Sequence, residues 1–262
     1  MNGDRCLFCR KLREEPLHFR TLLSPETPPG LCRSCAGKLA PIDPRRSCER
    51  CGRDLGRLDG RLVHGNICRD CERWAGSGRN GLFGKNRSLY SYNEMMKEII
   101  TAFKFRSDAV MAQAFRKEFR TAYRRLIRDD PSLWIRIRKG GRLFRNDPSH
   151  VIIPIPLSEE RLQQRGFNQA VLLTENLGRP ITEALIRRSG EEKQSKKNRR
   201  QRLKIPRNNP FTLDPQTASS IAGKKVILVD DIYTTGATLR LAAAAIEPAA
   251  PLSIDSLTLV HG

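Results

Sequence analysis

The stretch VILVDDIYTTGATL, residues 226–239, decides the fold class of this chain. Its four leading apolar residues predict a short buried strand, and two adjacent carboxylates, Asp230 and Asp231, follow directly. Threonines around Gly236 come next, and TLRLAAAAI, from Thr238 onward, predicts a helix. Open α/β sheets bind ligands in the crevice at the carboxyl ends of their strands, so both carboxylates are expected to project into that crevice.

The residue types in this stretch indicate a site for a ribose phosphate. Adjacent carboxylates accept hydrogen bonds from vicinal sugar hydroxyls, and they also hold Mg²⁺ through water. Gly236 lets the backbone approach an anion closely. A phosphate at the start of the following helix would meet free N–H groups and the positive end of the helix dipole. The TTGAT segment alone fits a turn and helix cap equally well, and the specificity comes from the whole string.

The flanking sequence places this strand in a parallel sheet. Strand and helix patterns alternate from residue 151 onward: VIIPIP, RGFNQAVLLTENL, ITEALIRR, VILV, TLRLAAAAI and DSLTLV. Such alternation is typical of an α/β fold with a parallel sheet flanked by helices, so residues 151–262 are predicted to form the core. One helix is expected over YNEMMKEIITAFKF, residues 92–105, and a second over residues 109–128; residues 81–150 are expected to form a helical hood or linker segment. WAGSGRNGLFG, residues 74–84, has the composition of a linker.

All eight cysteines lie before residue 72, in four CxxC pairs. If the CxxC pairs combine in sequence order, the cysteines form two groups of four: Cys6, Cys9, Cys32 and Cys35, and then Cys48, Cys51, Cys68 and Cys71. Each CxxC turn supplies two corners of a tetrahedral zinc site, and this spacing is near that of zinc ribbons. We therefore predict two structural Zn²⁺ sites in a small N-terminal domain, residues 1–80, that needs metal to fold.

Two alternatives stay open for the cysteines. Interleaved or nested pairing would give the same number of zinc sites with other ligand sets. A redox dithiol role is less favoured, because redox CxxC motifs usually sit beside a βαβ unit. A catalytic zinc is disfavoured, because four cysteine ligands leave no position for a substrate.

The composition excludes a disordered chain and indicates an anionic partner. The 262 residues are 39% hydrophobic, and the net charge is +20. Residues 104–145 carry a net charge of +9, and residues 187–207 carry +8. These basic segments are suited to binding the phosphate backbone of a nucleic acid. The aromatic content of 6% does not indicate extensive stacking on bases. A solvated basic face is the alternative interpretation.

The N-terminal residues and hydropathy point to a cytoplasmic protein. MNGDRCLFCR contains no apolar signal region, and the sequence has no apolar run of membrane-spanning length. We expect no membrane insertion. In a reducing compartment the cysteines are not expected to form disulfides.

The string at residues 226–239 resembles the 5-phosphoribosyl-1-pyrophosphate (PRPP) motif of type I phosphoribosyltransferases, in which two acids precede TTGAT. A second block, IPIPLSEERLQQRGFNQAVLLTENL, resembles the ComF (ComFC-type) family, as do ITAFKFRSD and the cysteine pairs, which match a double zinc ribbon. The basic segment KQSKKNRRQRLKIPRNNPF departs from the family pattern in its asparagine spacing.

The resemblance implies a type I phosphoribosyltransferase-like fold and a PRPP site with Mg²⁺. It implies these PRPP-binding residues: Asp230, Asp231, Thr234, Thr235, Gly236, Ala237, Thr238 and Arg165. Asp230 and Asp231 would also be the catalytic residues. The pyrophosphate loop maps to residues 155–159, and Lys104 and Arg106 are candidate sources of positive charge.

Two functions follow from the resemblance, both within natural transformation. One is a phosphoribosyltransferase that acts on an unidentified acceptor and releases pyrophosphate. The other is a single-stranded DNA-binding competence factor that keeps the fold as a scaffold or regulatory site. Other competence proteins are further candidate partners.

Overall fold

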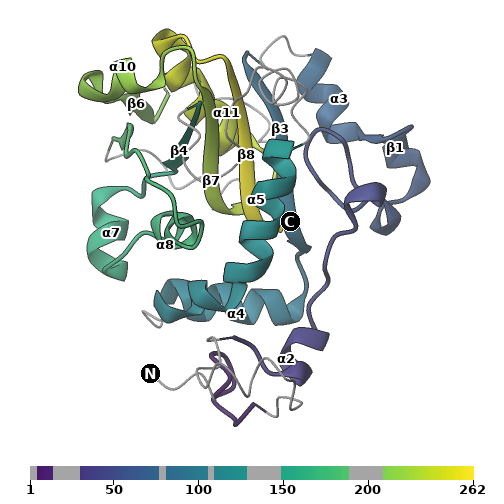
Figure 1. Ribbon diagram of the computed structural model, residues 1–262. Helices are drawn as coiled ribbons and strands as arrows, with labels where there is room; N and C mark the ends of the chain where they lie inside the picture. Colours follow the sequence, from purple (N-terminus) through teal and green to yellow (C-terminus); the bar gives the residue numbers. More distant parts are fainter. Residues whose placement is uncertain (1–4, 14–29, 77–80, 106–108, 129–148, 189–208) are drawn as a thin grey trace, which may run out of the picture.

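The computed structural model describes residues 5–13, 30–76, 81–105, 109–128, 149–188 and 209–262 (Figure 1). Its centre is a four-stranded sheet in the order β3-β8-β7-β4, with every neighbouring pair parallel. The strands are β3 (Phe83–Ser91), β8 (Ser253–His261), β7 (Lys225–Tyr233) and β4 (His150–Pro154). The predicted fold class, a parallel α/β sheet flanked by helices with a cysteine-rich N-terminal region, is confirmed.

Side chains of the central strand alternate between two apolar cores. Ile227 and Val229 pack into one core, while Val226 and Leu228 pack into the other. Burial on both faces explains the continuous apolar run that marks β7 in the sequence. The sheet is therefore the middle of three layers.

The first face is covered by α4 (Glu94–Phe105), a 3-10 helix η4 (Ala109–Phe115), α5 (Arg116–Arg128) and α8 (Gln169–Glu175). Met96, Ile99 and Phe103 recur at helical spacing along α4 and are fully buried. This confirms the helix predicted after residue 91. The predicted helix at residues 109–128 is divided, because its first seven residues form η4.

The second face is covered by α11 (Ala237–Ile246) and α10 (Ala218–Ile221). Ala242 and Ala243 of α11 are buried, and their small side chains permit close packing on the sheet. The remaining elements are α2 (Arg33–Gly37), η1 (Pro44–Arg46), η2 (Leu55–Arg57), η3 (Gly60–Leu62), β1 (Val63–His64), β2 (Ile67–Cys68), α3 (Arg69–Gly76), α7 (Glu159–Arg165), β5 (Leu185–Arg187), β6 (Phe211–Leu213), η6 (Pro215–Thr217) and η7 (Glu247–Ala249).

Two sequence predictions about the strands need correction. ITEALIRR contributes only β5, which pairs antiparallel with β6 in a separate small sheet. The fourth strand of the main sheet is instead β3, which begins inside the segment predicted as a linker. Polar side chains of β3 pair with polar side chains of β8: half-buried Ser88 places its Oγ 2.7 Å from Oγ1 of buried Thr258. A strand buried through hydroxyl pairs lacks the hydrophobic alternation by which strands are recognised.

The same predicted linker also contains the end of a helix. Trp74 lies in α3 and is 3% exposed, so this part of the segment is packed against the protein. In the part of the chain that the structure describes, none of the helices combines the length and apolar character needed to cross a membrane.

Candidate functional site

A crevice of about 570 Å³ opens at the carboxyl ends of β4 and β7. The predicted residues that line it are Lys104, Arg165, Asp230, Asp231, Thr234 and Thr238, together with Ile155, Pro156 and Leu157 from the expected pyrophosphate loop. Its size is within the usual range for small-molecule sites. Residues from four separate parts of the chain therefore meet where the sequence placed a ligand.

Asp231 is held in the crevice by an ion pair. Lys104, near the end of α4, places its Nζ 2.7 Å from Asp231 Oδ2, and both side chains are largely buried. Lys104 therefore supplies positive charge to the crevice, as expected. Arg106, the other candidate, lies outside the described residues.

Asp230 lies beside this pair, and its carboxyl group is close to that of Asp231. Its Oδ1 accepts a hydrogen bond of 2.8 Å from the backbone N–H of Asp231. Burial and the negative charge of Asp231 raise the pKa of Asp230 to about 8. A carboxyl group in this environment favours a ligand that brings a cation or hydroxyl donors.

The loop of residues 234–238, here called the threonine loop, turns sharply into α11. Gly236 has φ of +76°, and a Cβ there would collide with the Tyr233 hydroxyl and with Arg240 Nη1. Gly236 is also the N-cap residue, so the first N–H groups of α11 meet no capping side chain from it. The loop thus combines a glycine-only conformation with an anion-binding helix end.

Arg165 enters the crevice from the end of α7, a helix that the sequence analysis did not predict. Its Nη1 donates to Gln169 Oε1 at 3.1 Å. Burial lowers the pKa of Arg165, while the charges of Asp231 and Asp230 oppose that shift. The guanidinium remains available to an anion at the mouth of the crevice.

Asn168 has a structural role at the start of α8. Its side chain accepts from the Ala170 N–H as the cap of α8 and donates to the Ile155 carbonyl at 2.9 Å. Asn168 therefore joins α8 to the strand end from which the crevice opens. Phe167, from the same segment, packs against Phe103 with ring centroids 5.8 Å apart.

Sequence reasoning missed several residues at the site. Tyr92 and Gly262 line the crevice. Trp74 and Arg240 lie beneath the threonine loop: Trp74 Nε1 donates to the Thr235 carbonyl at 2.8 Å, and Arg240 Nη1 donates to the Tyr233 hydroxyl at 3.1 Å. An arginine within an otherwise apolar helical stretch was the available signal for Arg240.

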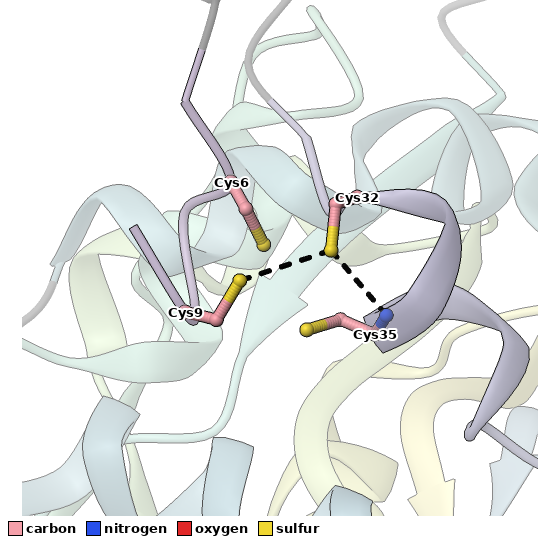
Figure 2. A group of neighbouring side chains, drawn as sticks. All are labelled: Cys6, Cys9, Cys32 and Cys35. Atoms are coloured by element: carbon pink, nitrogen blue, oxygen red, sulfur yellow. Dashed lines mark hydrogen bonds between the residues drawn. The ribbon is translucent and has the colours of Figure 1, made fainter. Parts of the chain in front are cut away.

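The four cysteines nearest the N-terminus converge on one point, as Figure 2 shows. Cys9 Sγ lies 3.8 Å from Cys32 Sγ, and the Cys35 N–H donates to Cys32 Sγ at 3.4 Å. Cys6 and Cys35 are buried against the core beneath α4. The first and second CxxC pairs thus form one cluster.

The third and fourth pairs form the second cluster. Cys48 Sγ lies 3.8 Å from Cys71 Sγ, and Cys51 Sγ lies 3.6 Å from Cys68 Sγ. Hydrogen bonds with the neighbouring thiols lower the pKa of Cys48 and raise that of Cys51. All four are buried in the same core as α11.

Both clusters fit tetrahedral zinc. Within each cluster the sulfur atoms lie within 4.8 Å of one another. A zinc–sulfur bond of about 2.3 Å gives tetrahedral edges of about 3.8 Å, close to the sulfur separations in both clusters. The pairing follows sequence order, and the N-terminal region fits a double zinc ribbon.

A second surface feature lies on α5. Its exposed side includes Arg116, Lys117, Arg124, Arg125 and Arg128, while Phe119 and Tyr123 face the core. A groove joins this side of α5 to the segment after α8, where Arg179 lies over the Tyr123 ring at 6.0 Å. The described part of the +9 segment is therefore an arginine-rich ridge. The rest of that segment, and nearly all of the +8 segment, lie outside the described residues.

Comparison with known proteins agrees with these features. The family model for the phosphoribosyl transferase domain matches residues 163–262. The chain is 38% identical to competence protein ComFC of Bacillus subtilis over 98% of this chain and 94% of that protein. It is 26% identical to competence protein ComFC of Streptococcus pneumoniae over 98% of this chain and 100% of that protein. It is also 26% identical to competence protein F of Haemophilus influenzae, over 80% and 81% of the two chains.

Proposed function

The chain belongs to the ComF family of competence proteins, and on this premise we propose that it binds PRPP in the crevice at Asp230 and Asp231. The observation that carries the proposal is the meeting of two adjacent carboxylates with the N-terminus of α11 in one crevice. Carboxylates suit the ribose hydroxyls, and the backbone N–H groups of the threonine loop suit the 5′-phosphate. A ribose 5-phosphate carries both vicinal hydroxyls and a phosphate.

The positively charged side chains of the crevice would bind the pyrophosphate group of PRPP. Arg165 and Lys104 both line the crevice, and Arg165 offers a guanidinium fork that binds phosphate oxygens in pairs. Asp230 and Asp231 are the residues that would hold Mg²⁺ with the ligand, and the ion would neutralise charge on the leaving group. The raised pKa of Asp230 supports this role, because a cation beside it removes the repulsion from Asp231.

The same arrangement supports phosphoribosyl transfer. A nucleophilic atom of an acceptor would form a bond to C1 of the ribose while the bond from C1 to pyrophosphate breaks, and the electron pair would leave with pyrophosphate. Positive charge develops at C1 in such a displacement, and Asp230 and Asp231 are placed to stabilise it. Catalysis would then come mainly from positioning and electrostatics.

A second function is favoured by the arginine-rich ridge on α5. Single-stranded DNA is the partner that fits a ridge of cationic side chains and a role in natural transformation. In this proposal the protein binds single-stranded DNA in the cytoplasm and acts with other competence proteins. PRPP would then be either a substrate or a regulator of the protein. The ridge and the crevice involve different residues, so one molecule can carry both functions.

Calorimetric titration of PRPP with Mg²⁺ into the zinc-loaded protein tests the first function. The wild type is expected to bind, and Asp231→Asn is expected to weaken binding about 10- to 100-fold, because a charged hydrogen-bond acceptor is lost. Asp255→Asn is the matched control, since Asp255 lies near the amino end of β8 and accepts from the Lys85 N–H. A wild type that does not bind PRPP would overturn the proposal and leave DNA binding as the leading function.

A further inference from the structure

The underside of the threonine loop rests on the second cysteine module, residues 47–76. Trp74 of α3 donates from its indole Nε1 to the Thr235 carbonyl at 2.8 Å, across a buried interface. This hydrogen bond joins an element of the N-terminal region directly to the loop at the crevice. The Thr235 carbonyl is therefore bonded to Trp74, and the N–H groups at the start of α11 can be used by a ligand in the crevice.

Arg240 completes this support from within α11. It is 5% exposed, and its guanidinium carbon lies 4.4 Å from the centre of the Trp74 ring and 5.1 Å from that of Phe83. Its Nη1 donates to the Tyr233 hydroxyl at 3.1 Å and to the Gly236 carbonyl at 3.3 Å. A buried guanidinium held by aromatic faces and by these acceptors ties the residue before the loop to the glycine in its middle.

The position of Trp74 depends in turn on the cysteine cluster. Cys71 and Trp74 are three residues apart on α3, so they lie on the same side of the helix, and both are buried. Cys71 Sγ is 3.8 Å from Cys48 Sγ within the cluster. Zinc in that cluster would fix the orientation of α3 and hence the point from which Trp74 donates.

A separate contact from the same module reaches the crevice. Arg53, two residues after Cys51, donates from Nη2 to the Gly262 carbonyl at 2.9 Å, and Gly262 lines the crevice. Nη1 of Arg53 forms an ion pair with Asp70 Oδ2 of α3 at 3.0 Å. The module therefore contacts the crevice wall at two points, Thr235 and Gly262.

We infer that Trp74 and Arg240 are positioning residues for the PRPP site, and that they couple occupancy of the second zinc cluster to PRPP affinity. This inference rests on the proposed function. Coupling of this kind is reciprocal: if zinc in the cluster strengthens PRPP binding, PRPP strengthens retention of that zinc by the same factor.

The test compares two proteins that both carry Trp134→Phe: the parent protein, which keeps Trp74, and the variant Trp74→Phe. Phenylalanine keeps the aromatic face against Arg240 and removes the N–H donor. Trp134→Phe is the common background, which leaves Trp74 as the fluorophore. Calorimetry is expected to give about five- to tenfold weaker PRPP binding for Trp74→Phe, which corresponds to one hydrogen bond. In the parent, Trp74 emission is expected to shift on addition of PRPP at the same midpoint as the calorimetric titration.

Zinc release to a chelator supplies the readout that a merely structural role would not change. PRPP is expected to slow release of one zinc several-fold in the parent, and to leave the release rate unchanged in Trp74→Phe. Arg240→Lys keeps the charge and loses the planar fork, and it serves as the second variant if Trp74→Phe unfolds in circular dichroism. Parent protein that binds PRPP, with unchanged affinity in the variants and zinc release insensitive to PRPP, would overturn the inference. Parent protein that does not bind PRPP would instead overturn the proposed function.

Discussion

At the scale of single residues, Gly236 is the most constrained position of the site. Alanine there would need a left-handed φ and would place its Cβ into Tyr233 and Arg240. We expect Gly236→Ala to lose PRPP binding in calorimetry, because the loop must move to admit the methyl group. Gly223→Ala is the matched control: Gly223 has φ of +67°, and a Cβ there would meet no neighbouring atom within 4 Å, so the two variants share only the backbone strain. Equal loss of affinity in both variants would contradict this account of the loop.

Asp230 predicts a pH dependence of stability. Its pKa is raised from 3.8 to about 8 in the folded protein, so folding takes up a proton between these values. The free energy of unfolding should therefore fall as pH rises from about 4 and level off above about 8. Asp230→Asn removes this contribution, and its melting temperature should exceed that of the wild type by several degrees at pH 8.5, with little difference near pH 4. Thermal unfolding at both pH values measures this, and a variant less stable than the wild type at pH 8.5 would refute it.

The residues of the threonine loop could be identified from the sequence because they are contiguous. The string at residues 226–239 holds two carboxylates, the loop and the helix start in one segment. The ion pair between Lys104 and Asp231 joins distant segments, and only the expectation of positive charge in the crevice pointed to it. The hydrogen bond from Trp74 to Thr235 could not be predicted, since Trp74 stood in a segment with the composition of a linker.

At the scale of elements, the proposed DNA-binding role of α5 can be tested separately from PRPP binding. We expect Arg124→Ala with Arg128→Ala to weaken single-stranded DNA binding and to lower the slope of log affinity against log salt by about 1.4, because two phosphate contacts are lost. PRPP affinity should stay unchanged. Fluorescence anisotropy at several salt concentrations measures the slope.

A matched control for α5 uses two arginines of the N-terminal region, one just before the second cysteine module and one within it. Arg45→Ala with Arg61→Ala removes the same charge from side chains that are about nine-tenths exposed and paired with Asp43 and Asp59. A slope that falls equally in both double variants would show that total charge, and not α5, controls DNA binding.

The strand β3 shows which elements the sequence conceals. The strands β4, β7 and β8 contain apolar runs that face two cores, and all three were predicted. In β3, Asn86 is fully buried and accepts from Ser256 Oγ at 2.9 Å, so polar pairing takes the place of hydrophobic packing. Strands and helices with a periodic apolar pattern can therefore be predicted from the sequence, whereas a strand held by buried hydrogen bonds cannot.

At the scale of the whole molecule, zinc is expected to hold the N-terminal region to the core. Elemental analysis should give two zinc ions per chain, and Cys51→Ser should give one, because its cluster would keep three thiols. Removal of zinc by a chelator should lower the melting temperature, since both clusters contribute buried residues to the two cores. A zinc-free protein with unchanged stability would contradict the structural role.

The two cysteine modules are expected to differ in their influence on the crevice. The first cluster packs beneath α4, whereas the second lies in the same core as α11, beside the threonine loop. Figure 1 places α2 below α4, and α3 beside β3. The molecule thus combines a crevice, a basic ridge and two cysteine modules around one sheet, and we propose that the crevice binds PRPP.

A crystal structure of the zinc-loaded protein with PRPP and Mg²⁺ tests that claim most directly. The account predicts the 5′-phosphate against the backbone N–H groups at the start of α11, with the ribose hydroxyls on Asp230 and Asp231. The pyrophosphate is predicted to lie toward Arg165 and Lys104. Clear density for PRPP at another surface, with the crevice occupied by water alone, would contradict it.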